Sequence, residues 1–272
     1  MEIGAYGKQS QAEVSMLNQS NFRVIARLDV KNGKLIKGIH LEGLRILGDP
    51  NEFALDYYNQ GIDEIVLMDP VASLYGRNTL GEVLGAAVND IFVPITAGGG
   101  IRNLDDARSL LRAGADKVAI NTGAINRPEL IREIAEEFGS QAIVLSVEAK
   151  RVGSGWIAYT DNGRESSNLP VVDWISMGIE LGAGEMLVTS IDREGTRRGF
   201  DQDLIALIDP IATVPFIVSG GMGKLADLKP LSTFANVDAV AIASVIHYQI
   251  ERVSAIKDYS RNLGFHVRHK AH

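Results

Sequence analysis

A chain of 272 residues is long enough for one large α/β barrel or for two modest domains. Its composition, with 46% hydrophobic and 22% charged residues, is that of a globular protein rather than a disordered or coiled-coil chain. A formal charge of −7 with scattered basic residues argues against nucleic-acid binding, and the absence of cysteine excludes disulfides, thiolate nucleophiles and cysteine-based zinc sites.

Residues 1–21 are predicted to form an N-terminal extension. They contain the polar runs GKQSQ and NQSN and no apolar segment typical of a secretory signal. Residues added during expression are the alternative. No later stretch reaches the roughly 18 consecutive apolar residues of a membrane span. We therefore expect a cytoplasmic protein with no membrane contact, and the lack of cysteine fits a reducing compartment.

Eight short apolar runs rich in β-branched residues alternate with amphipathic stretches after the extension. This alternation is typical of βα units that build a parallel sheet. The predicted strands are Val24–Leu28, Glu64–Met68, Val93–Thr96, Lys117–Ile120, Ala142–Val147, Glu185–Val188, Pro215–Val218 and Ala239–Ile242.

Two of the intervening helices carry clear boundary signals. In the first, Asn103 is predicted to be the N-cap and Gly114 to end the helix, with Leu104, Ala107, Leu110 and Leu111 on one face. In the second, Pro128 suits the first helical position and Gly139 ends the helix.

The chain also repeats itself at one offset. GIDEIVLMD from Gly61 is matched by GAGEMLVTS 121 residues later, PITAGGGI from Pro94 by PFIVSGGM after 121, and ADKVAINT from Ala115 by VDAVAIAS after 122. Four βα units were duplicated, which favours a closed (β/α)8 TIM barrel over a doubly wound sheet. GGGI also lacks the spacing of a dinucleotide-binding loop. We predict a single barrel over residues 22–272, with half-barrels at about 22–140 and 141–268.

Function in such a barrel is expected where the strands end. The glycine-rich exits Gly98–Gly100 and Gly220–Gly221 expose backbone N–H groups that can bind phosphate, beside small polar residues one strand further on. The sequence therefore predicts two phosphate sites, although glycines that only allow close helix packing remain the alternative. The polar strand ends are Asp29, Asp69, Gly98–Gly100, Asn121, Thr122, Glu148, Thr189, Ser190, Ser219–Gly221, Ala243 and Ser244.

Asp29 and Glu148 occupy equivalent positions, 119 residues apart, at the end of the first strand of each half. Two carboxylates that face each other across a mouth can divide general-acid and general-base work if their pKa values differ. The alternative is a buried ion pair, because Lys31 follows Asp29 by two residues and Lys150 follows Glu148 by two.

Four charged residues open strands at the opposite end: Arg23, Glu64, Lys117 and Glu185. A closed ring of these side chains across the axis would plug the barrel and could act as a gate, and a structural layer of salt bridges is the alternative. His40 and His247 lack metal-ligand spacing and are expected to be structural or loop residues. No metal or cofactor is predicted.

The motifs together resemble the cyclase subunit of imidazole glycerol phosphate synthase. The resemblance covers residues 22–268 and rests on RLDVKNGKLIKG, GIDEIVLMD, GGGIR, GADKVAINT, FGSQAIV, GAGEMLVTSIDREGT and SGGMGK, which occur in the family's order. It implies a lyase-type cyclisation in histidine biosynthesis. Ammonia from a class I glutaminase docked on the barrel bottom attacks a bisphosphorylated ribulosyl aminoimidazole carboxamide nucleotide, which is split and closed to imidazole glycerol phosphate.

The resemblance also implies roles for single residues. Asp29 would be the general acid or base, and Lys37 would lie on a mobile loop after it. Arg23, Glu64, Lys117 and Glu185 would form the ammonia gate, and Asp116 and Gln141 would face the partner. Substrate and phosphate contacts would fall on Gly100, Asn121, Thr122, Glu194, Gly195, Gly221, Ala243 and Ser244.

Two departures affect the reacting end. Glu148 and Glu194 stand where the family usually has aspartate, and a carboxylate displaced by about an ångström can lower a rate roughly 100-fold. MDPVASLYGRN and SVEA also resemble a divergent branch linked to surface polysaccharides. There the barrel would carry ammonia to a sugar amidotransferase. A related ribosyl-isomerase barrel, which also uses two carboxylates, is a third reading, but the charge ring has no purpose in it.

Overall fold

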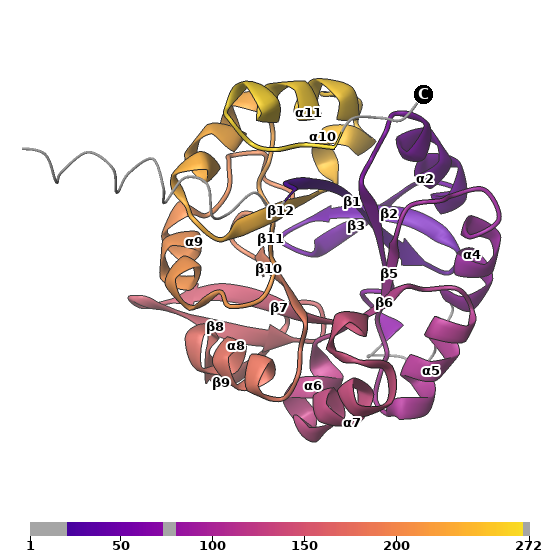
Figure 1. The fold of residues 1–272 in the computed structure, drawn as a ribbon, viewed down its shortest axis with the longest axis vertical. Helices are drawn as coiled ribbons and strands as arrows, with labels where there is room; N and C mark the ends of the chain where they lie inside the picture. Colours follow the sequence, from indigo (N-terminus) through magenta and orange to yellow (C-terminus); the bar gives the residue numbers. More distant parts are fainter. Residues whose placement is uncertain (1–20, 73–79, 269–272) are drawn as a thin grey trace, which may run out of the picture.

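The computed structural model describes residues 21–72 and 80–268. The predicted extension, apart from residue 21, lies outside the described residues. Eight parallel strands form a closed barrel, with helices around its outside (Figure 1). Closure is complete because each strand pairs with the next and the last, β12, returns to the first at Arg23–Ala239. The barrel strands are β1 (Arg23–Lys31), β4 (Glu64–Met68), β5 (Ile95–Gly98), β6 (Lys117–Ile120), β7 (Ile143–Val152), β10 (Glu185–Ser190), β11 (Phe216–Ser219) and β12 (Val237–Ile242).

The prediction of eight strands and a TIM barrel is confirmed. β4 and β6 have the predicted bounds, and β5 begins two residues later than predicted. The largest differences lie at the ends of β1 and β7, which continue beyond the apolar run into the site. The helical segments between and after the strands are α2 (Pro50–Asn59), α4 (Leu80–Ala87), α5 (Leu104–Arg112), α6 (Thr122–Asn126), α7 (Glu129–Phe138), η1 (Ser140–Ala142), α8 (Val171–Glu180), α9 (Gln202–Ile208), η2 (Asp209–Ile211), η3 (Leu225–Thr233), α10 (Ser244–His247) and α11 (Val253–Asn262).

Helix boundaries follow the predicted capping chemistry. The side chain of Asn103 accepts a hydrogen bond from the Asp106 backbone N–H and starts α5, and α7 ends at Gly139 with a φ of 84°. Pro128 takes the N-cap position of α7, one residue before the position predicted for it. Gly114, with a φ of 112°, follows α5 as expected.

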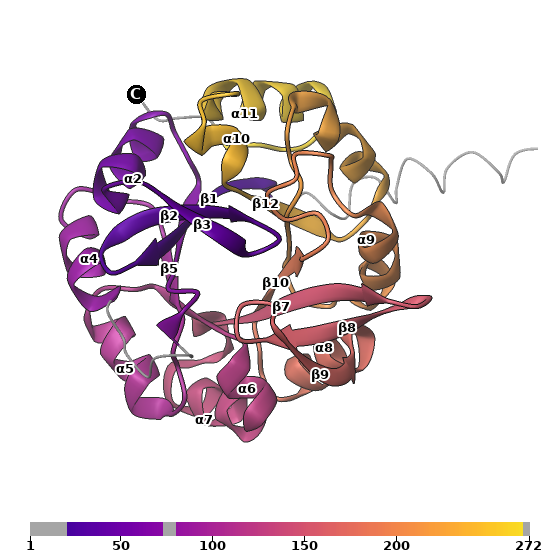
Figure 2. The same cartoon turned by 180° about the vertical axis from the view of Figure 1, so that it is seen from behind.

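Two β-hairpins were not predicted, and they occupy matching places in the two halves. β2 (Lys34–Ile39) and β3 (Glu42–Gly48) follow β1, and β8 (Gly155–Thr160) and β9 (Glu165–Pro170) follow β7. β2 pairs antiparallel with β1, and β8 pairs antiparallel with β7, so each hairpin extends a barrel strand beyond the mouth. Figure 2 shows the β2–β3 hairpin crossing the ring of strands.

Apolar side chains form two separate clusters. The larger one lies between the strands and the surrounding helices. The smaller one contains one or two residues from most of the barrel strands and fills the interior of the barrel, as expected for this fold. It consists of Ile25, Val66, Met68, Ala119, Val144, Leu187, Ile217, Ala239 and Ala241. Among the described residues, no helix combines the length and the hydropathy needed to cross a bilayer.

Candidate active site

Asp29 lies at the mouth on β1 and is only 6% exposed. Its Oδ1 is 3.0 Å from Nε of Arg27, and Arg27 Nη1 donates to Thr189 Oγ1 at 2.9 Å. Side chains two apart on a strand share a face, so Arg27 and Asp29 both point into the barrel. Arg27 is a site residue that the sequence reasoning missed, although this spacing could have found it.

Glu148, on β7, is 8% exposed, and its Oε2 accepts the backbone N–H of Gly163 at 2.8 Å. Neither carboxylate pairs with the lysine two residues further on, so the alternative of ion pairs with Lys31 or Lys150 is wrong for the described residues. Nζ of Lys150 instead lies over the Tyr159 ring, 5.3 Å from its centroid.

The two carboxylates have oppositely shifted pKa values. Burial alone would raise the pKa of Asp29, but the charges of Arg27 and Lys37 outweigh it and hold the pKa below its usual value. Burial raises the pKa of Glu148 to about 7, against the opposing effects of Arg27 and of the Gly163 N–H. Near neutral pH the mouth therefore holds one ionised carboxylate and one carboxyl group that can gain or lose a proton.

Lys37 lies on β2, so the segment expected to be a mobile loop is a hairpin strand in the structure. The side chain is 3% exposed, and its Nζ forms an ion pair with Glu194 Oε1. His247 also belongs to this group, because its pKa responds to Lys37 and to Asp29. Burial lowers the pKa of His247 to about 4, so the ring is neutral, and the Tyr57 hydroxyl lies 2.7 Å from its Nδ1.

The first predicted phosphate site borders a cavity of about 260 Å³. Gly100, Asn121 and Thr122 line it together with Glu148, so the glycine exit and the carboxylate face the same space. The side chains of Asn121 and Thr122 also hold the β8–β9 hairpin. Asn121 Nδ2 donates to Tyr159 O at 3.0 Å, and Thr122 Oγ1 accepts from the Asp161 N–H at 3.0 Å.

The second predicted phosphate site is far tighter. Gly195, Gly221, Ala243 and Ser244 line a cavity of only about 20 Å³, next to Arg27 and Glu194. Ser244 and Gly195 also border an adjoining cavity of about 740 Å³ that contains Lys37 and Arg197. The two sites therefore differ in the space they offer, although equivalent sites were expected.

Backbone geometry relates the two predicted phosphate sites closely. Asn121 has φ −128° and ψ −89°, and Ala243 has φ −135° and ψ −81°, each just before a short helix. The equivalent glycines Gly99 and Gly220 have φ values of 112° and 94°, and an added Cβ would lie 2.3 Å from the carbonyl oxygen of Asp69 in the first and 2.9 Å from that of Ser190 in the second. These glycines are required by the backbone, so close packing is part of their role. The matching angles support the prediction of duplicated halves.

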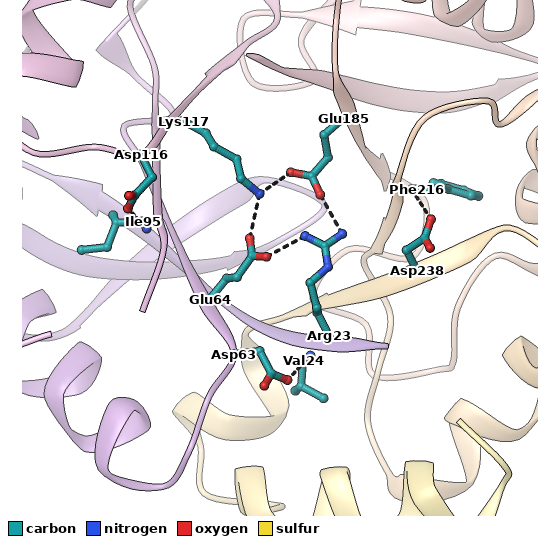
Figure 3. A network of polar contacts seen from close by, with 10 residues as sticks. All are labelled: Arg23, Val24, Asp63, Glu64, Ile95, Asp116, Lys117, Glu185, Phe216 and Asp238. Carbon is teal, nitrogen blue, oxygen red and sulfur yellow. Dashed lines mark hydrogen bonds and ion pairs between the residues drawn. The ribbon is translucent and has the colours of Figure 1, made fainter. Parts of the chain in front are cut away.

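The four predicted charged residues form a closed ring at the other end of the barrel (Figure 3). Arg23 bridges Glu64 at 2.6 Å and Glu185 at 2.7 Å, and Lys117 bridges the same two carboxylates at 3.1 and 2.7 Å. Burial tends to lower the pKa of Arg23, but Glu185 and Glu64 raise it above its usual value. The structure thus brings together all four residues predicted to form the gate.

Three aspartates near this ring each accept a backbone N–H group close to the start of a neighbouring strand. Asp63 Oδ2 accepts the Val24 N–H at 2.9 Å, Asp116 Oδ2 accepts the Ile95 N–H at 2.8 Å, and Asp238 Oδ2 accepts the Phe216 N–H at 3.0 Å (Figure 3). Asp116 lies at this end as the resemblance implied. Gln141 is exposed, and its Nε2 donates to Phe138 O at 3.0 Å.

A closed (β/α)8 barrel with two carboxylates of opposite pKa shift at its mouth belongs to the barrel enzymes that act at the carboxyl ends of their strands. Residues 23–251 match the family model described as "Histidine biosynthesis protein". The chain is 59% identical over 207 residues to imidazole glycerol phosphate synthase subunit HisF of Legionella pneumophila, covering 76% of this chain and 98% of that protein.

Two further relatives cover more of the chain. The HisF subunits of Mycobacteroides abscessus and Streptomyces avermitilis are 45% and 47% identical, each over 90% of this chain and 98% of the relative. The chain therefore belongs to the HisF family, the cyclase subunits of imidazole glycerol phosphate synthase, which are lyases of histidine biosynthesis. These names favour the cyclase over the polysaccharide-linked alternative.

Proposed function

We propose that the mouth of this barrel carries out the ammonia-dependent cyclisation with Asp29 and Glu148 as its acid–base pair. The observation that carries this assignment is the opposite shift of the two pKa values. Asp29 stays ionised and accepts protons. Glu148, with a pKa of about 7, donates them near neutral pH.

Proton transfers in both directions are what this reaction needs. Ammonia must lose protons as its nitrogen bonds to carbon, and the oxygen and nitrogen atoms that leave must gain them. In this proposal the substrate occupies the cavity beside Glu148, which Asn121 and Thr122 also line. Arg27, 3.0 Å from Asp29, keeps the base charged inside the buried mouth.

The two phosphates of the substrate bind at opposite sides of the mouth in this proposal. Gly100, Asn121 and Thr122 hold one, with the backbone N–H groups at the start of α6 directed at its oxygens. Gly195, Gly221, Ala243 and Ser244 hold the other. The roughly 740 Å³ cavity that adjoins Gly195 and Ser244 contains Arg197, whose guanidinium adds positive charge there.

Ammonia enters through the charge ring at the bottom and crosses the barrel interior. The interior cluster between ring and mouth is apolar and includes the small side chains Ala119, Ala239 and Ala241, which suits a small neutral molecule better than an ion. The term subunit in the relatives' names implies a partner subunit. We place that partner, a class I glutaminase, on the face with the ring and with Asp116 and Gln141.

The test is an assay of the isolated chain with the bisphosphorylated substrate and ammonium salts. The wild type should form imidazole glycerol phosphate, and Asp29→Asn should lose at least about 100-fold in kcat. Asp258→Asn, an exposed carboxylate on α11, is the matched control and should keep full activity. A wild type that forms no product but still binds a glutaminase would reject the cyclase and favour the sugar-amidotransferase conduit.

A further inference from the structure

The two unpredicted hairpins touch each other above the mouth. Asn162 Nδ2, in the turn between β8 and β9, donates to the carbonyl oxygen of Leu41, in the turn between β2 and β3, at 2.9 Å. Both residues are buried, and both have positive φ values, 59° for Asn162 and 63° for Leu41. A Cβ built on Gly163 would lie 3.1 Å from Leu41 Cδ1, so the turns also pack closely. The contact joins segments 121 residues apart.

Glu194 ties the β2–β3 hairpin to the barrel at three points. Its Oε1 forms the ion pair with Lys37, its Oε2 accepts the Leu41 N–H at 3.4 Å, and its backbone oxygen accepts the His40 N–H at 3.0 Å. The side chain is 5% exposed. Both carboxylate oxygens are thus engaged by the hairpin, which leaves Glu194 poorly placed to bind a substrate phosphate.

Each hairpin is therefore held by a glutamate from the barrel. Glu194 holds the β2–β3 hairpin, and Glu148 holds the β8–β9 turn through the Gly163 N–H at 2.8 Å. An aspartate at either position would withdraw its carboxylate by about 1.5 Å, the length of one C–C bond. At Glu194 that shortening would break the simultaneous contact with Lys37 and with Leu41.

We propose that the two hairpins form one hydrogen-bonded cover over the mouth, in which Glu194 and Asn162 are positioning residues that hold Lys37 beside Asp29. The proposal rests on the proposed function only in making Asp29 the base. Within the described part of the chain, Lys37 forms its ion pair with Glu194, and it lies on the strand that pairs directly with β1 at Asp29 and Ile36. Loosening the cover therefore moves the Lys37 ammonium away from the carboxylate of Asp29.

Hydrogen–deuterium exchange of the whole chain tests the cover without any substrate. Asn162→Gly removes the bond to Leu41 and suits the positive φ. It should speed exchange of the amides in residues 34–48, on the other hairpin, about fivefold, the effect of losing one hydrogen bond of ordinary strength. Asn168→Gly is the matched control, because Asn168 is exposed, lies in β9 of the same hairpin as Asn162 and has a φ of 62°. Unchanged exchange in Asn162→Gly, or an equal rise in Asn168→Gly, would overturn the proposal.

Glu194→Gln provides a second variant that keeps the side-chain shape. It should also speed exchange in residues 34–48. Two ties that close one cover add in its opening free energy, so in the double variant with Asn162→Gly the increase should approach the product of the two single increases. A double variant whose increase only equals the sum of the two single increases would mean that the two ties close separate openings, and would reject the single cover.

The pH–rate profile gives the readout for positioning. In Asn162→Gly, which changes no charge, the acidic limb, set by Asp29, should move to higher pH as the Lys37 charge recedes. A lower rate with an unshifted limb would reject the positioning of Lys37. Should the chain show no cyclase activity at all, the exchange experiment still decides whether the cover exists, so the two proposals fail separately.

Discussion

Replacing Glu148 with glutamine should stabilise the protein at alkaline pH and leave it unchanged at acid pH. The Glu148 pKa rises from an ordinary value of 4.5 to about 7 on folding, so the folded state holds a proton that the unfolded state releases. The free energy of unfolding keeps its full value below pH 4.5, decreases as the pH rises from 4.5 through 7, and remains lower above pH 7. At about 1.4 kcal/mol per pKa unit, the loss amounts to about 3 kcal/mol.

Glutamine removes this loss because it is neutral at every pH and can still accept the Gly163 N–H. Denaturant unfolding of the wild type and of Glu148→Gln, at pH values from 4 to 9, measures the difference in free energy of unfolding. We expect about zero at pH 4 and about 3 kcal/mol in favour of the variant at pH 9. Glu165→Gln, an exposed glutamate in β9, is the control and should show no such trend. A difference that does not depend on pH would refute the assignment of a buried, protonated Glu148.

Three further predictions concern the site and the ring. Asp29→Asn should lower kcat at least about 100-fold in steady-state assays with ammonium salts while KM for the bisphosphate changes less than about threefold; a large change in KM alone would contradict its role as the base. Arg27→Ser should raise the pKa of Asp29, so that the acidic limb of the pH–rate profile moves to higher pH; an unmoved limb would contradict the electrostatic role of Arg27. Lys117→Met should lower the free energy of unfolding in denaturant by about 1–3 kcal/mol, because Glu64 and Glu185 each lose a partner, and should change glutamine-driven turnover relative to ammonium-driven turnover; an unchanged ratio would contradict the gate.

The barrel could be predicted because its signals are local and repeated. Each strand is an apolar run with clear ends, and the 121-residue offset removes the ambiguity of any single run. The hairpin after β1 also had a local signal, since Asn32 and Gly33, with φ values of 50° and 70°, form the Asn-Gly turn typical of tight hairpins. It was missed because the segment was interpreted through its lysine and the family's loop.

Contacts between distant segments could not be predicted in the same way. The bond from Asn162 to Leu41 and the pairing of Lys37 with Glu194 join residues 121 and 157 positions apart, and no spacing rule connects them. The charge ring was predictable only because all four of its residues open strands of one barrel, which places them at the same end. Packing between distant segments also sets the small volume of the second predicted phosphate site.

The duplication explains why one barrel can hold two carboxylates with opposite pKa shifts. Arg27 precedes Asp29 by two residues, and the matching position before Glu148 is Ser146, which is 3% exposed and carries no charge. Arg27 contacts Asp29 directly at 3.0 Å, whereas it reaches Glu148 only as a more distant charge. Burial tends to raise the pKa of both carboxylates. The difference between arginine and serine at one repeated position, together with Lys37 from the β2–β3 hairpin, is therefore enough to keep one ionised and let the other hold its proton.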